Sequence, residues 1–178
     1  MIAINLPNAK NCMAHLLLNT TFDSFLFIEG EIVTANTFTI DGFIQKKFYR
    51  NGATDSPDSS FEDTSIPDYT LWKDIRDYAF SIIKGKRTPL SFKFIYSASP
   101  EDIQTIITSS ALDIMPGDVQ GLYLNIKFDG EHLLCITGTS FKSFSLDKTL
   151  ERAWDAHVQL FFEEAGVAFE TIDGQIFI

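Results

Sequence analysis

The sequence predicts an α+β fold in which a largely antiparallel, twisted sheet carries helices packed on one face. Short turns separate several runs of β-favouring residues, and short turns are typical of antiparallel strand pairs. Amphipathic stretches with apolar residues at helical spacing lie between these runs. The alternation of the two kinds of segment predicts a sheet with one helical layer.

The composition is that of one globular domain. The chain has 178 residues, of which 45% are apolar and 21% charged. A chain of this size buries enough surface to fold without a disulfide or a metal. We therefore expect a single domain over residues 1–178, and the composition excludes a wholly disordered or fibrous protein.

The formal net charge of −10 restricts the classes of partner. Nucleic acids and anionic membrane surfaces are polyanions, so this charge argues against both. The apolar runs are too short for a membrane span, and polar residues near the N-terminus interrupt any secretory signal. Cys12 and Cys135 lie in apolar runs and are expected to be buried free thiols, although their number also allows a disulfide. These features predict a cytoplasmic protein.

Each predicted element has a local sequence signal. In the first half, these elements are a strand over 2–6, a helix over 9–18, strands over 25–35 and 37–43, and a helix ending at Lys84. In the second half they are a strand over 90–98, a helix over 100–111, a hairpin of 122–128 with 131–137, a helix over 148–165, and a closing hairpin of 167–172 with 175–178. Asn8 is predicted to cap the first helix, either Asp68 or Thr70 the second, and Asp147 the last.

The predicted order suggests an internal duplication. A β-α-β-β-α series occurs in residues 1–89 and again in 90–178, followed by the C-terminal hairpin. Trp72 and Trp154 each mark the closing helix of a series. A duplicated unit with structural halves 1–89 and 90–178 is therefore one hypothesis for the fold.

The segment 51–68 differs from the rest of the chain. It contains five acidic residues and no Lys or Arg, and Gly, Pro, Ser and Thr fill most of the remaining positions. Too few apolar residues are present for it to bury, so we expect an exposed, mobile acidic loop. The regular acidic spacing of a calcium loop is absent.

No motif for catalysis or for a cofactor is present. The sequence has no Gly-rich nucleotide loop and no nucleophile elbow. His15, His132 and His157 lie too far apart in sequence for helical zinc spacings, so no metal site and no cofactor are predicted. His157 lies among apolar residues of its helix, which favours a core or boundary histidine.

The basic cluster Lys84, Lys86, Arg87 and Thr88 is the leading candidate site. Three cations fall within four positions of an acidic chain, where a helix ends and a strand begins. They either complement the dipole at the helix C-terminus or bind an anion or an acidic partner. A second basic patch comprises Lys46, Lys47 and Arg50.

Weaker candidates lie at the end of the second strand of the predicted hairpin 122–137 and just after it. Thr137, Thr139, Ser140 and Lys142 supply hydroxyl groups and a cation that could hold a phosphate. The end of a strand explains the same pattern equally well.

Seventeen phenylalanines indicate either a Phe-rich core or a pocket for an apolar ligand. We favour a non-enzymatic binding or protein-interaction domain, whose partner is a protein or a small ligand and which could form homo-oligomers. The alternatives are a small apolar-ligand binder with a Phe-lined pocket, and a hydrolase or transferase without a recognisable motif.

Several strings together resemble a known kind of family. They are residues 22–30, 36–42 and 83–90 and the stretch 137–154. The chain resembles an uncharacterised domain-of-unknown-function family of bacterial hypothetical proteins from gut anaerobes. The resemblance implies a bacterial cytosolic protein, and it carries over no functional residue.

Overall fold

The computed structural model describes residues 1–50 and 66–172. Most of the predicted acidic loop 51–68 and the last predicted strand, 175–178, therefore lie outside the described residues. Within them, strands and helices follow the predicted chain order closely. The short helix α2 (Lys47–Arg50) was not predicted.

A seven-stranded sheet organises the molecule, and all its strand pairs are antiparallel. The strands are β1 (Ala3–Asn5), β2 (Leu26–Val33), β3 (Thr37–Asp41), β4 (Ser91–Ser97), β5 (Val119–Phe128), β6 (Leu133–Phe141) and β7 (Glu170–Ile172). Their order across the sheet is β3-β2-β4-β5-β6-β1-β7. The predicted α+β class with an antiparallel sheet is thus confirmed.

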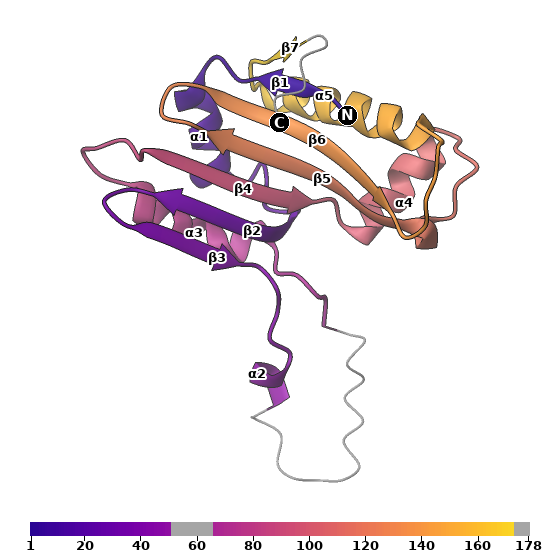
Figure 1. Cartoon of the computed structure of the whole chain (residues 1–178), viewed down its shortest axis with the longest axis horizontal. Helices are drawn as coiled ribbons and strands as arrows, with labels where there is room; N and C mark the ends of the chain where they lie inside the picture. Colours follow the sequence, from indigo (N-terminus) through magenta and orange to yellow (C-terminus); the bar gives the residue numbers. More distant parts are fainter. Residues whose placement is uncertain (51–65, 173–178) are drawn as a thin grey trace.

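The longer helices cover one face of the sheet, as Figure 1 shows. They are α1 (Ala9–Leu17), α3 (Trp72–Ile83), α4 (Pro100–Ser109) and α5 (Thr149–Ala165), and a 3₁₀ turn over Pro116–Asp118 precedes β5. Helix α3 contacts β2 and helix α5 contacts β6, so each end of the sheet has its own cover.

Phenylalanine fills the space between sheet and helices. Phe27 and Phe94 are fully buried, and both contact the ring of Trp72 at centroid distances of 5.1 and 5.2 Å. Phe22 packs edge-on against Phe161, with their centroids 5.3 Å apart. Aromatic packing of this kind makes these Phe residues part of the core, as one of the two predictions held, whereas Phe38, Phe43, Phe48 and Phe144 are exposed.

The opposite face of the sheet carries no helix within the described residues. Side chains alternate along a strand, so β4 sends Phe92 and Phe94 to the helices and Lys93 and Ile95 to the open face. Phe92 and Phe94 are buried, whereas Lys93 is exposed and Ile95 partly exposed. The open face is therefore mixed in polarity.

The structure corrects several local predictions. Helix α3 begins at Trp72 with Leu71 as its N-cap, so neither Asp68 nor Thr70 caps it. The backbone of Thr70 instead forms hydrogen bonds with Gly42 and Phe27, which places this residue before the start of the helix. Of the two alternatives for His157, the core position is wrong, because the residue is exposed; its ring stacks on the buried Trp154 at 5.6 Å between centroids, at the boundary of the core.

The strands of the two predicted halves, 1–89 and 90–178, do not have the same neighbours in the sheet. In the second half, β4 lies beside β5, the strand that follows it. In the first half, β1 is separated from β2 and instead lies between β6 and β7. β7 was predicted to pair with 175–178, and its partner among the described strands is β1. The duplication stays a hypothesis.

Candidate functional site: a basic pocket between α1 and the α3–β4 loop

A pocket of about 430 Å³ lies at one end of the helical layer. That volume falls in the range of small-molecule sites. Its walls come from the start of α1, the end of α3, the loop from α3 to β4, and the strands β4 and β5. The lining residues are Ala9, Lys10, Met13, Ile83, Lys84, Gly85, Lys86, Arg87, Thr88, Pro89, Phe92 and Phe128.

The antiparallel packing of α1 and α3 creates this pocket. At one end of the pair, the indole Nε1 of Trp72 donates a hydrogen bond to the backbone oxygen of Leu16 at 2.7 Å. Trp72 opens α3 and Leu16 is near the end of α1. The first turn of α1 therefore lies beside the last turn of α3, where Lys10 and Lys84 line the same pocket.

The pocket gathers positive charge. It holds four of the fourteen Lys and Arg side chains of the protein, namely Lys10, Lys84, Lys86 and Arg87. Among the described residues, no carboxylate lines it. Across residues 1–50 and 66–172, none of the four cations has a carboxylate oxygen within ion-pair distance. Among the described residues, Lys46, Arg76 and Lys93 are the Lys and Arg side chains with a carboxylate at ion-pair distance, so what distinguishes these four is that they line one pocket.

Part of this charge has a structural explanation. Lys84 is the C-cap of α3, where a cation complements the helix dipole. Its amine also lies 5.9 Å from the centre of the Phe80 ring, a cation–π contact. The dipole prediction made for the cluster therefore accounts for Lys84.

The position of Lys10 has no such explanation. Asn8 caps α1 and accepts a hydrogen bond from the backbone N–H of Asn11, so Lys10 lies in the first turn. The positive end of the helix dipole disfavours a cation there, and this turn contains no acidic residue. Lys10 and the start of α1 therefore add positive potential to a pocket that is already basic. An anion in the pocket would relieve this repulsion.

The floor of the pocket is apolar. Phe92 and Phe128 are nearly buried, with 2% and 8% of their surface exposed, and their rings stack at 5.4 Å between centroids. Met13 and Ile83 are half-buried beside them. The cations and Thr88 are all exposed. The pocket thus has a charged rim above a hydrophobic base.

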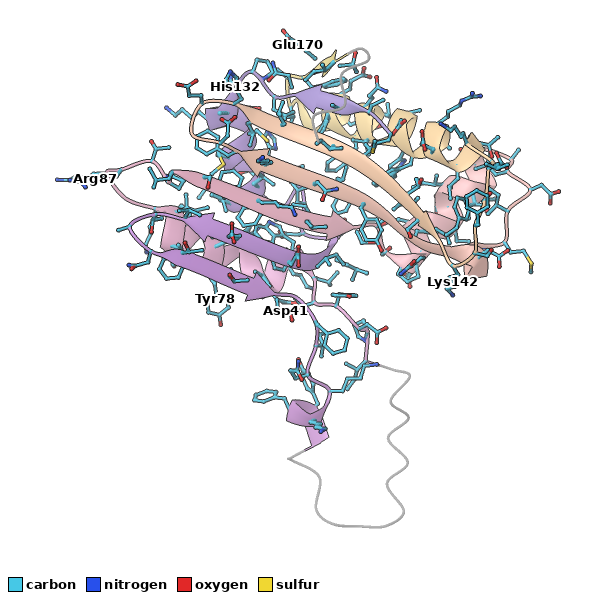
Figure 2. The ribbon with its side chains drawn as sticks, viewed as in Figure 1. Asp41, Tyr78, Arg87, His132, Lys142 and Glu170 are labelled. Atoms are coloured by element: carbon cyan, nitrogen blue, oxygen red, sulfur yellow. The ribbon has the colours of Figure 1, made fainter. Side chains whose placement is uncertain are left out.

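The structure places every residue of the leading sequence candidate in this one pocket. It does not gather the weaker candidates in the same way. Thr137 is buried, and its hydroxyl bonds the carboxylate of Asp155 on α5. Ser140 instead bonds Gln120 at 3.0 Å. Figure 2 shows Lys142 at the opposite end of the molecule from Arg87.

The second basic patch is also separate. Lys46 lines a different hollow of about 510 Å³, where its amine lies 2.9 Å from the carboxylate of Asp68. Tyr69 and Tyr123 line that hollow too, and burial, followed by the proximity of Tyr69, raises the pKa of Tyr123. Because Lys46 is already paired with Asp68, we expect this hollow to bind an anion more weakly than the basic pocket does.

Carboxylates meet where β2 pairs with β3: Glu29 lies opposite Asp41, and Glu29 and Glu31 line a shallow hollow together with Lys93. Glu29 and Glu31 are exposed on the open face, and Glu29 lies 4.0 Å from the amine of Lys93. Asp41 accepts a hydrogen bond from the backbone N–H of Phe43. In the described parts of the chain, no cluster of three His, Cys, Asp or Glu side chains is placed to hold a metal ion.

Both cysteines are buried free thiols, in agreement with one sequence alternative. Burial raises the pKa of Cys12 to about 12, and it also raises the pKa of Cys135. A thiol in this state is a poor nucleophile, because the thiolate is the reactive form. The cysteines therefore belong to the core.

Sequence reasoning missed Lys10 and Met13. They lie about 75 residues before the basic cluster and come near it only because α1 packs against α3. The one local signal was a cation in the first turn of a helix without acidic residues.

The fold and the pocket define an α+β protein with a basic, apolar-floored cavity at one end of its helical layer. Residues 15–170 match DUF5721, described as a family of unknown function, and the chain belongs to this family. This agrees with the resemblance to a domain of unknown function. Neither a curated protein nor a solved structure gives a match. None of the described helices is long and apolar enough to cross a membrane.

Proposed function

We propose that this protein is a non-enzymatic binding domain whose ligand is an anion held in the basic pocket. The observation that carries the proposal is the convergence of Lys10 with Lys84, Lys86 and Arg87 on a cavity that no carboxylate of residues 1–50 and 66–172 lines. Like charges that line one pocket repel one another and raise its positive potential. An anion contacting Lys10 from α1 and Arg87 from the loop would offset them directly.

The chemistry of the rim suits a carboxylate or a phosphate. Arg87 offers a planar set of donors that matches either group, and the lysines act as point charges. The exposed hydroxyl of Thr88 and the N-terminal turn of α1 add further donors. A protein of net charge −10 can bind an anion only where positive side chains are concentrated, and the pocket is such a place.

Calorimetric titration with pyrophosphate at low ionic strength tests the proposal. We expect one pyrophosphate per chain and weaker binding as salt rises. The double variant Lys86→Ala/Arg87→Ala should weaken binding about tenfold, because each exposed charge contact contributes up to about 1 kcal/mol. Lys10→Ala should weaken it several-fold.

Lys127→Ala is the matched control. Lys127 precedes the pocket residue Phe128 in β5 but projects to the opposite face, and it is exposed. Lys127→Ala removes one positive charge, as Lys10→Ala does, but it leaves the pocket unchanged. Pyrophosphate should therefore bind to Lys127→Ala as it binds to the unmodified chain. Equal losses in Lys127→Ala and in Lys10→Ala would show that only net charge matters, and no binding at all would refute the proposal.

A further inference from the structure

We infer that the ligand of the basic pocket is an amphipathic anion, a soluble carboxylate or phosphate monoester that also carries an apolar chain or ring. This inference rests on the proposed function, since it assigns the ligand class of the same site. Its basis is the separation of the pocket into a charged rim and an apolar floor.

The apolar floor distinguishes this pocket from a site for a bare ion. Phosphate is strongly hydrated, so contact with Phe92, Phe128 and Met13 removes water without providing hydrogen bonds. An apolar group in the same place gains by leaving water. The floor therefore favours a ligand with a second, hydrophobic part.

The two parts of the pocket lie on different elements. The charged groups Lys84, Lys86 and Arg87 come from the end of α3 and the loop after it. The aromatic floor comes from β4 and β5, whose rings of Phe92 and Phe128 stack on each other and are nearly buried. The apolar part of a ligand would thus contact the sheet, and its charged part would contact the loop after α3. Gly85, with a φ of +152°, lies in that loop.

The volume limits the size of the ligand. About 430 Å³ is the size of a site for a small molecule. The net charge of −10 disfavours an anionic lipid surface as the source of the ligand. We therefore assign a free, soluble amphipathic anion.

A homologous series of ligands tests the inference. Affinity is measured by calorimetry for inorganic phosphate, ethyl phosphate, butyl phosphate and hexyl phosphate. We expect affinity to rise by up to about fourfold for each added methylene until the floor is covered. Phosphate that binds as tightly as hexyl phosphate would overturn this inference and leave the proposed anion site intact, whereas an absence of binding across the series would refute both.

A floor variant locates the apolar part of the ligand. Met13→Ser makes the floor more polar and should flatten the rise in affinity from ethyl to hexyl phosphate, whereas Met13→Leu should restore it. Circular dichroism checks that both variants fold. An unchanged rise in Met13→Ser would place the alkyl chain elsewhere and overturn the inference. Binding to vesicles containing phosphatidic acid, without binding of soluble hexyl phosphate, would also overturn it.

Discussion

Single side chains explain local features that sequence patterns indicate only in outline. Asp129-Gly130 predicts a hairpin, and the structure shows how the pair forms it. The carboxylate of Asp129 accepts hydrogen bonds from the backbone N–H groups of His132 at 2.7 Å and Glu131 at 3.0 Å. Gly130 adopts a φ of +102°, which a residue with a Cβ rarely adopts.

These hydrogen bonds make the turn sensitive to pH. The backbone donors of His132 and then Glu131 lower the pKa of Asp129 below its ordinary value of 3.8. A carboxyl group with a lowered pKa in the folded state stabilises the fold above its unfolded pKa, and this stabilisation is lost as the pH falls through the folded value. Asp129→Asn should therefore lower the urea midpoint at pH 7, and the difference from the unmodified chain should shrink as the pH falls below 3.8.

Glu131→Gln is the control for this measurement. It removes one charge from the same turn, leaves Asp129 in place, and should keep the urea midpoint close to that of the unmodified chain. A midpoint difference for Asp129→Asn that stays constant from pH 7 to pH 3 would contradict the account.

At the scale of elements, most helices and strands were predictable because their signals are local. Ser99 caps α4 through the N–H of Asp102, and Pro100 is the first residue of the helix that was predicted over 100–111. Gly166 ends α5 in the left-handed region, with a φ of +70°. The start of α3 was predicted wrongly, because Leu71 is fixed by a bridge to Leu26 and not by a capping side chain.

Gly42 shows why an element boundary can depend on tertiary packing. Its N–H donates to the backbone oxygen of Ile28 at 2.8 Å, and a Cβ at Gly42 would lie only 1.8 Å from the backbone oxygen of Phe27. Gly42→Ala should therefore lower the free energy of unfolding by at least about 2 kcal/mol, measured by urea unfolding. Gly117→Ala, where a Cβ meets nothing within 4 Å, should change it by less than about 0.5 kcal/mol. Equal losses in the free energy of unfolding for the two variants would show that the fold tolerates a Cβ at Gly42, and would contradict this prediction.

At the scale of the whole molecule, the sequence predicted the layers but not the order of strands. Local patterns contain no information that places β1 between β6 and β7. The same limit applies to the site. The cluster at Lys84, Lys86 and Arg87 is visible as a run in the sequence, whereas Lys10 and the floor residue Phe128 join it only in the folded chain.

The central claim is that the basic pocket is the anion site of this protein. The most direct measurement is a ¹⁵N–¹H NMR titration of the full chain with pyrophosphate. The account predicts that the largest shift changes occur at residues 9–13 and 83–88, which line the pocket. Changes concentrated instead at residues 66–69 and 97–103, around the hollow that contains Lys46, would contradict it.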